Sequence, residues 1–295
     1  RGMRPHPGRD GKILTDWNGL MVAALASASR AFENPAYYRT AKTAMRCILD
    51  RLRLADGRLL HRYCDGEAAI TGFADDYAFI IRALIELYET SFDPAWLEDA
   101  LSLNQCLERH FSDTDKGGFF TTSDEGEVLL VRKKEIYDGA IPSCNSIMLG
   151  NLVLLGHLTG DPVHEEAASR LADSFSGIVS RSPSSFCAYL SGLDHLLGPA
   201  LDVVIAGDEQ DPRVTGMIRQ TRDTYLPSVT VNIRPSAADD AALDTLAPFT
   251  RTLVPLEGKA TAYVCSGRTC SVPVTTIEGL RELLREKSDG EIKDS

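Results

Sequence analysis

The sequence predicts a mainly α-helical protein: a partial α/α toroid of helical hairpins followed by a small C-terminal α/β domain. Up to Leu197, apolar residues recur at helical spacing in long segments that pair into hairpins. After Pro199, short strand-like segments alternate with helical ones, which is typical of an α/β unit. We therefore place the toroid at residues 1–198, the α/β domain at residues 199–286 and a disordered tail at residues 287–295.

The composition excludes several classes of protein. Hydrophobic residues make up 43% of the 295 residues and charged residues 25%, which is ordinary for a globular protein. A net charge of −11 argues against a nucleic-acid partner, because binding phosphates requires a basic surface. No apolar run is long enough for a membrane span, and the first residues lack the apolar core of a signal peptide. We therefore expect a cytoplasmic protein that binds neither membrane nor nucleic acid.

The first half of the chain predicts two hairpins separated by a short β segment. The first hairpin pairs helices at about residues 17–32 and 36–54, and residues 58–66 predict a strand and a turn. The second hairpin pairs helices at about 75–88 and 95–110, the latter capped by Asp93-Pro94.

A third hairpin follows a loop. Residues 118–131 resemble a β-hairpin around Asp124-Glu-Gly126. Helices then follow to about Gly160 and from Pro162 to about Val179, and a seventh runs from Ser184 to Leu197. In the α/β domain we expect strands near 201–207, 229–233 and 260–264, with helices at 212–224 and 277–286.

A polar motif precedes the more apolar helix of each hairpin. The motifs are Asp16-Trp17-Asn18-Gly19, Gly72-Phe-Ala-Asp-Asp-Tyr77 and Asp138-Gly-Ala-Ile-Pro-Ser-Cys-Asn-Ser146, and their acids recur about 60 residues apart. Since each motif stands before an inner helix, all three motifs should lie at the same end of the array.

The acids of these motifs are candidate catalytic groups. Asp75, Asp76 and Asp138 could place carboxylates around one cavity, as acid/base chemistry on a sugar requires. The competing interpretation is helix capping, because an aspartate at a helix N-terminus accepts hydrogen bonds from unpaired N–H groups. Adjacent helical residues point in different directions, so at most one of Asp75 and Asp76 should face the cavity.

Other polar and aromatic side chains near the motifs are candidate ligand-binding groups. A sugar ring could stack on the aromatic side chains of Trp17, Tyr63 and Tyr77, although packing in the protein core is an equal alternative for these three residues. His61 is the best placed of the six histidines, in the strand-like segment before the second motif. Ser143 is more readily explained as a helix cap than Asn145 is. The full set of candidate binding residues is Trp17, Asn18, His61, Tyr63, Tyr77, Arg132, Ser143 and Asn145.

No metal, cofactor or phosphate site is expected. Cys265 and Cys270 have C-x4-C spacing, but no further ligands lie nearby, which favours two separate thiols over a metal or redox centre. The seven cysteines are scattered and form no disulfide framework, which suits a reducing compartment.

Four stretches in the same order make the chain resemble a known family. They are Asp10-Gly-Lys-Ile-Leu-Thr-Asp-Trp-Asn-Gly-Leu-Met21, Gly72-Phe-Ala-Asp-Asp-Tyr-Ala78, Tyr137-Asp-Gly-Ala-Ile-Pro-Ser-Cys-Asn-Ser146 and Ala262-Tyr-Val-Cys265 with Cys270. Over nearly its whole length the chain is similar to the C-terminal part of the thioredoxin-domain-containing, spermatogenesis-associated-protein-20-like family. The resemblance implies a toroid similar to six-hairpin glycosidases and N-acylglucosamine 2-epimerases. It also implies partners within the same polypeptide: a thioredoxin-like domain and the other part of the toroid, both absent from this chain.

Two functions follow from these motifs and the resemblance. The first is binding or processing of a carbohydrate-like small molecule by carboxylate acid/base chemistry, as a glycoside hydrolase or a sugar epimerase would do. Epimerases of similar fold use paired histidines, and no second histidine stands in a motif here. The alternative is a noncatalytic interaction scaffold attached to the redox domain. An incomplete toroid would also expose the apolar flank of an inner helix.

Overall fold

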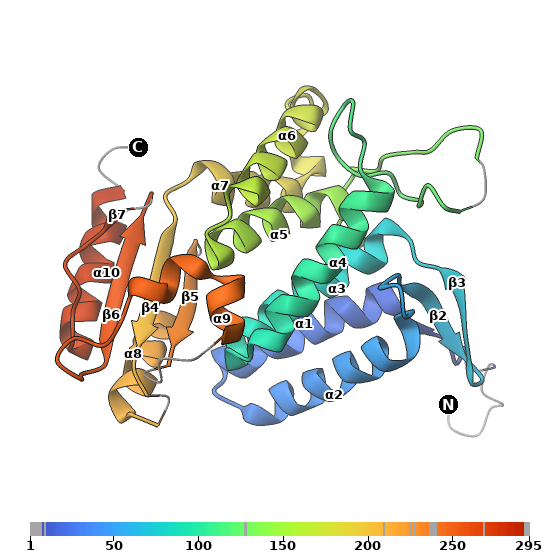
Figure 1. Ribbon diagram of the computed structural model, residues 1–295. Helices are drawn as coiled ribbons and strands as arrows, with labels where there is room; N and C mark the ends of the chain where they lie inside the picture. The colour runs from blue at the N-terminus through green and yellow to red at the C-terminus, as the bar shows by residue number, and fades with distance from the viewer. Residues whose placement is uncertain are drawn as a thin grey trace, which may run out of the picture.

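Helices of the computed structural model form two layers of an arc, with an α/β unit beside it (Figure 1). The structure describes residues 8, 10–126, 129–208, 210–224, 226, 228–235, 241–267 and 269–291. The inner layer contains α1 (Thr15–Ala31), α3 (Ala74–Ser91), α5 (Cys144–Thr159) and α7 (Cys187–Leu197). The outer layer contains α2 (Pro35–Leu52), α4 (Pro94–Phe111) and α6 (Pro162–Val179). Consecutive inner helices pack against each other, and α1, α3 and α5 each pair with the outer helix that follows, which confirms the predicted α/α-hairpin toroid arc.

The outer helices begin at the same local signal. In each, an Asn or Asp cap accepts a hydrogen bond from the backbone N–H two residues on, and a proline holds the first helical position. The three pairs are Asn34-Pro35, Asp93-Pro94 and Asp161-Pro162. The helix starts are therefore determined locally, which explains why they can be predicted from sequence.

Burial separates the central inner helices from those at the ends of the arc. In α3, 13 of 18 residues are buried, and in α5, 13 of 16. In α1 only 6 of 17 residues are buried, and in α7 only 2 of 11. The terminal inner helices therefore each lack a neighbour on one side.

Gly19 allows α1 and α3 to approach closely. A Cβ atom at this position would lie 2.8 Å from the backbone carbonyl carbon of Phe79, closer than real contacts allow. The glycine of the first motif thus sets the spacing that brings the N-terminal ends of the two helices together.

A small antiparallel sheet covers this end of the arc. Its strands are β1 (Ile13–Leu14), β2 (Leu60–Cys64) and β3 (Glu67–Thr71), in that order. Asp65 and Gly66 form the turn between β2 and β3 with positive φ angles of 52° and 86°. The predicted strand and turn are confirmed.

The β-hairpin predicted at residues 118–131 is wrong for the residues that the structure describes; Glu127 and Val128 lie outside them. The described residues between α4 and α5 form an irregular loop, and a bridge joins Ser112 to Phe119. The Arg132 guanidinium holds it by donating to the carbonyl groups of His110 and Thr122. These side-chain bonds replace the strand pairing that alternating residues suggest.

The C-terminal unit has a mixed sheet of order β5-β4-β6-β7, which contains the three predicted strands and a short fourth one, β7. The strands are β4 (Leu201–Ala206), β5 (Val229–Arg234), β6 (Thr261–Ser266) and β7 (Thr269–Cys270). Helices α8 (Pro212–Asp223) and α10 (Ile277–Glu291) pack on the sheet's own apolar core. The remaining elements are α9 (Ala241–Leu246) and the short 3-10 helices η1 (Pro183–Ser185) and η2 (Pro248–Thr252). Helix α10 runs past the expected end at Glu286, and residues 292–295 lie outside the described part of the chain.

Buried polar bonds join the arc to the α/β unit. The Tyr88 hydroxyl of α3 donates to the Asn232 side chain of β5, and Asn232 donates to the Leu158 carbonyl of α5 at 3.2 Å. Within the described residues, no helix has the length and hydrophobicity that a membrane crossing needs.

Candidate functional site

The N-terminal ends of α1 and α3 are joined by Asp76. One carboxylate oxygen accepts a hydrogen bond from the backbone N–H of Asp16 at 2.9 Å, and the other from that of Phe73 at 2.8 Å. Asp76 is fully buried. It therefore caps its own helix and binds the start of the neighbouring one, which brings the first two motifs together at one end of the arc.

His61 reaches the same carboxylate from β2. Its Nδ1 lies 3.0 Å from both Asp76 oxygens, and its ring packs edge-on against Phe73. With Nδ1–H donating to Asp76, Nε2 is the nitrogen left to exchange a proton. The Asp76 hydrogen bond raises the pKa of His61 more than burial lowers it.

Asp75 occupies a different environment from its neighbour. Its carboxyl group accepts from the backbone N–H of Cys144 at the start of α5. Burial raises the pKa of Asp75 to about 6, with the charges of Asp76, Asp16 and Glu135 adding to the effect. Asp75 therefore has the properties of an acid that can hold or release a proton near neutral pH.

Asp16 is the fourth ionisable residue at this end of the arc, beside His61, Asp75 and Asp76, although the sequence did not predict it as a catalytic candidate. Its side chain is buried, and one oxygen accepts from the Trp17 N–H at 2.7 Å. Burial and the nearby Asp76 charge raise its pKa. Its position as the leading acid of the first motif is the signal that could have identified it. We call Asp16, His61, Asp75 and Asp76 the acid cluster.

Three members of the acid cluster could in principle approach a metal ion. One ligand atom from each of Asp16, His61 and Asp76 lies within 4.8 Å of the others. However, both Asp76 oxygens already accept backbone N–H bonds, and His61 Nδ1 points at them. Since these atoms satisfy one another, we interpret the group as a hydrogen-bonded Asp–His pair.

The structure corrects the catalytic role expected of Asp138. Its carboxylate accepts hydrogen bonds from the backbone N–H groups of Ser143, Ala188 and Tyr189 at 3.0, 2.9 and 3.2 Å. Asp138 thus closes the turn before α5 and caps the start of α7. With its lone pairs engaged by backbone groups, it acts as a cap and not as the partner of Asp75.

The polar residues of the third motif also serve the fold. Ser143 is the N-cap of α5 and accepts from Ser146 N–H, which confirms the capping interpretation. Asn145 is buried; it accepts from Phe119 N–H at 2.7 Å and donates to the carbonyl groups of Phe119 and Glu135. The expected ligand-binding role of Asn145 is corrected to that of a support for the loop.

Most of the other candidate binding residues are engaged within the protein. Tyr77 is buried, and its hydroxyl accepts from Leu59 N–H, so it fills the core and cannot serve as a stacking platform. Tyr63 contacts the Arg51 guanidinium, and Asn18 donates to the Leu14 carbonyl at 2.7 Å. Arg132 is likewise held by loop carbonyl groups.

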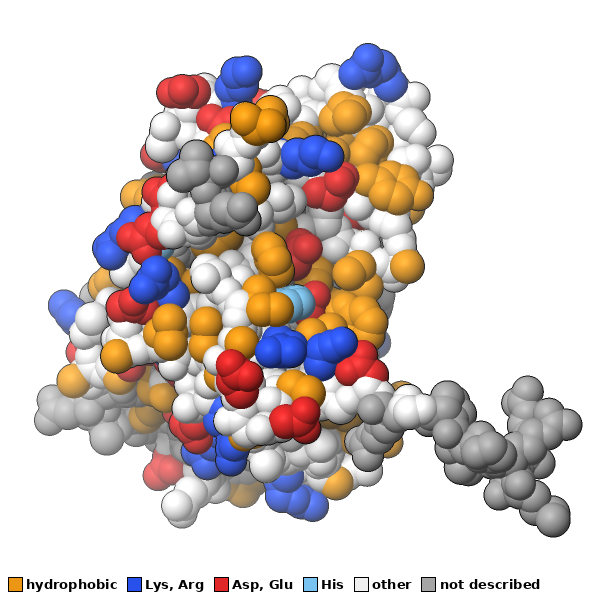
Figure 2. Space-filling view, turned by 90° about the vertical axis from the view of Figure 1, so that its right-hand side faces the viewer, with side chains coloured by type: hydrophobic (Ala, Val, Ile, Leu, Met, Phe, Trp, Pro, Cys, Tyr) orange, Lys and Arg blue, Asp and Glu red, His pale blue; other side chains and the backbone are white. Residues whose placement is uncertain are grey.

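Trp17 differs from these residues because it is 60% exposed and directly follows Asp16. Figure 2 shows the corresponding end of the molecule, where a histidine lies among hydrophobic side chains, with Lys or Arg side chains next to it and acidic groups nearby. The structure therefore brings together Asp16, His61, Asp75 and Asp76. It engages Asp138, Tyr77, Arg132 and Asn145 in hydrogen bonds within the protein.

Comparison with known proteins agrees with the resemblance seen in the motifs. No protein-family model matches the chain. Human spermatogenesis-associated protein 20 is 35% identical over 297 residues, covering 96% of this chain and 37% of the human protein. The rat protein of the same name is 31% identical, covering 97% of this chain and 37% of its own.

A more distant likeness comes from solved structures. Cellobiose 2-epimerase from Bacillus thermoamylovorans superposes with a TM-score of 0.49 and 17% sequence identity, over 58% of this chain and 46% of that one. A likeness at this level carries no conclusion about chemistry. The family assignment rests on the relatives found by sequence. The chain spans little more than a third of the length of these relatives. The chain belongs to the spermatogenesis-associated-protein-20-like family.

Proposed function

We propose that this chain supplies part of a site that binds and processes a carbohydrate-like small molecule by proton transfer. Asp75 is the proposed acid, and His61, held by Asp76, is the proposed base. The observation that carries the proposal is the convergence of these groups at the N-terminal ends of α1 and α3, where a half-buried Asp75 with a raised pKa lies beside a paired histidine.

The geometry favours proton transfer over glycoside hydrolysis. Hydrolysis commonly uses two carboxyl groups on either side of the bond that is cleaved. Here Asp138 caps α7 and Asp76 is occupied by two backbone N–H groups and His61. What is left is the imidazole of His61 with the carboxyl groups of Asp75 and Asp16, whose pKa values are both raised. An acid beside an imidazole suits removal and return of a proton at a carbon beside a carbonyl group, as in isomerisation or epimerisation of a reducing sugar.

Trp17 provides a surface for the proposed ligand. The apolar C–H face of a sugar ring packs on an indole, and Trp17 is exposed next to the buried Asp16. Its neighbours on the helix surface do not cover it, so the ring is accessible from solvent in this chain.

Proton exchange with solvent tests the proposal. A panel of reducing sugars is incubated in D2O with this chain and, in parallel, with the full-length human relative, and deuterium at the carbon beside the carbonyl is measured by NMR. We expect exchange that His61→Gln and Asp75→Asn each reduce by about 100-fold or more. Glu98→Gln, an exposed acid on the outer helix α4, is the matched control and should retain full activity.

Two outcomes contradict the proposal. One is release of a sugar from a glycoside without any C–H exchange, which indicates hydrolysis. The other is absence of exchange and of any stabilising sugar in thermal unfolding, for both proteins, since a ligand that binds only the folded state must raise its stability.

We also propose that both ends of the arc are covered by further toroid helices of the same polypeptide, and that this polypeptide also carries a thioredoxin-like domain. The low burial of α1 and α7 supports this, because an inner helix of a closed ring has neighbours on both sides. The relatives are long enough to supply such helices, since this chain spans 37% of the human protein.

The uncovered face of α1 predicts self-association of the isolated chain. Trp17 and Met21 are 60% and 59% exposed one helical turn apart, and such apolar surface drives association. Trp17→Ser with Met21→Ser should shift the chain from oligomer to monomer in light scattering at equal concentration. A wild-type chain that is already monomeric would contradict the expectation. The control is Val163→Ser, at an exposed residue on the outer helix α6.

A further inference from the structure

A polar row crosses one face of the C-terminal sheet. Thr230 of β5 pairs with Asp202 of β4, Asp202 with Cys265 of β6, and Cys265 with Cys270 of β7. Residues paired directly across strands project to the same face. Bonds link the row: the Thr230 hydroxyl donates to Asp202 at 2.6 Å, and Cys265 and Cys270 form a disulfide. The expectation of two separate thiols is therefore wrong.

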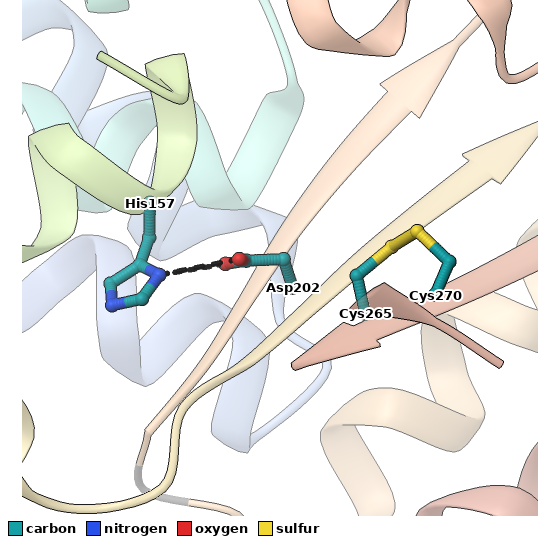
Figure 3. Close-up of a disulfide and its surroundings, with 4 residues drawn as sticks. All are labelled: His157, Asp202, Cys265 and Cys270. Carbon is teal, nitrogen blue, oxygen red and sulfur yellow. Dashed lines mark hydrogen bonds and ion pairs between the residues drawn. A yellow bond between two sulfur atoms is a disulfide. The ribbon is translucent and has the colours of Figure 1, made fainter. Parts of the chain in front are cut away.

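The row continues into the helical arc through His157 of α5. Its Nδ1 lies 3.1 Å from a carboxylate oxygen of Asp202 (Figure 3). In Figure 3, Asp202 lies between the histidine and the disulfide, on the strand next to that of Cys265. The disulfide thus stands next to a side-chain pair that joins the two parts of the protein.

A cleft of about 420 Å³ opens at this junction. His157, His195 and Asp202 line it from the arc and from β4, and Ser266 and Gly267 line it from the end of β6 and the turn that follows. The position of this turn therefore determines one wall of the cleft.

The two sulfur-bearing residues differ in exposure. Cys265 is 6% exposed, whereas Cys270 lies on the exposed two-residue edge strand β7. An external thiolate can therefore approach Cys270, with Cys265 as the group that leaves. Among the described strands, β7 pairs with β6 alone, so the disulfide adds a covalent bond to the backbone hydrogen bonds that hold this edge.

We propose that Cys265–Cys270 is a reversible thiol–disulfide exchange site, open to small dithiols in the folded protein, and that its state controls the wall of the adjoining cleft. A dithiol thiolate attacks Cys270 Sγ, the protein S–S bond breaks, and Cys265 leaves as a thiolate that takes up a proton. The second thiol of the reagent then displaces Cys270, so the dithiol is oxidised to its cyclic disulfide and the protein gains two electrons and two protons.

Native-state reduction with dithiothreitol tests the first part. Free thiols are first blocked with N-ethylmaleimide; dithiothreitol is then added, and newly formed thiols are trapped with iodoacetamide and located by peptide mass spectrometry. We expect two iodoacetamide groups, at Cys265 and Cys270. Their rate of appearance should stay constant at low urea concentrations, because attack on an exposed sulfur does not require unfolding.

Either of two results overturns the exchange site. Maleimide on Cys265 and Cys270 in the first step shows that no disulfide exists. A reduction rate that rises about fivefold or more per molar urea shows that the bond opens only when the protein unfolds.

The histidine resonances test the link to the cleft. Reduction should move the imidazole signals of His157 and leave those of His110, which pairs with Asp124 on the arc, unchanged. The double variant Cys265→Ser with Cys270→Ser should reproduce the reduced spectrum, and Cys47→Ser, at an exposed free thiol, is its matched control. Unchanged His157 signals on full reduction would overturn the proposed control of the cleft; the reduced wild-type protein decides this even if the double variant does not fold.

Discussion

Replacing Asp76 with alanine is expected to destabilise the folded chain by about 3–5 kcal/mol, because it leaves several buried donors without an acceptor. The backbone N–H groups of Asp16 and Phe73 and the Nδ1–H of His61 all donate to this carboxylate. Asp76 is fully buried, so water cannot replace it without rearrangement. The loss would release the start of α1 from α3 and leave His61 without orientation.

Urea unfolding followed by circular dichroism at pH 7 measures the effect. Asp76→Asn retains one acceptor oxygen and should fall between the wild type and the alanine variant. Asp138→Ala is the comparison, because it removes a cap from the less buried α7 and should cost only about 1–2 kcal/mol. If Asp76→Ala lowers the free energy of unfolding by less than Asp138→Ala does, Asp76 does not join α1 to α3.

Asp75→Asn, in contrast to Asp76→Ala, is expected to increase the free energy of unfolding, by about 2 kcal/mol at pH 7.5. The pKa of Asp75 is about 6 in the folded state and 3.8 in the unfolded chain, so the folded state holds the proton more tightly. Its contribution to stability is full below pH 3.8 and is lost as pH rises through about 6. Above that pH the ionised, half-buried carboxylate opposes folding, and the neutral amide removes this cost.

The pH dependence separates this effect from general repacking. The free energy of unfolding is measured for both proteins between pH 4 and pH 8, and the advantage of Asp75→Asn should shrink toward zero at the acid end. His61 also has a raised pKa, so its own contribution is lost as pH rises through its folded value. The Asp75 charge is one cause of that raised pKa, so the His61 contribution should be smaller in Asp75→Asn than in the wild type. A variant that is less stable than wild type at pH 7.5 would contradict this expectation. Stability gained together with activity lost is the pattern expected of a functional residue.

Local signals in the sequence predict the hairpins and the position of the motifs. Three outer helices are capped by residues at their own N-termini, so the start of each helix can be predicted from a few neighbouring residues. The capping pairs are Asn34-Pro35, Asp93-Pro94 and Asp161-Pro162. The repeat likewise predicts that the motifs meet at one end, and the bond from Asp16 N–H to Asp76 agrees with this.

Partners distant in the chain explain what the sequence could not predict. Asp138 bonds to Ala188 and Tyr189, about 50 residues away, so its role as a cap of α7 is not visible in its own motif. Asn145 is held by Phe119 across the loop, which also replaces the predicted hairpin. The register of β6 and β7 pairs Cys265 with Cys270, and spacing alone does not reveal that register.

The titration of the Asp75 carboxyl group by carbon-13 NMR tests most directly whether the acid cluster forms one coupled site. We expect a midpoint near pH 6 in the wild-type chain and a lower midpoint in Asp16→Asn, because the Asp16 charge contributes to the raised pKa. A wild-type midpoint near the ordinary value of 3.8, unchanged by Asp16→Asn, would contradict a coupled site.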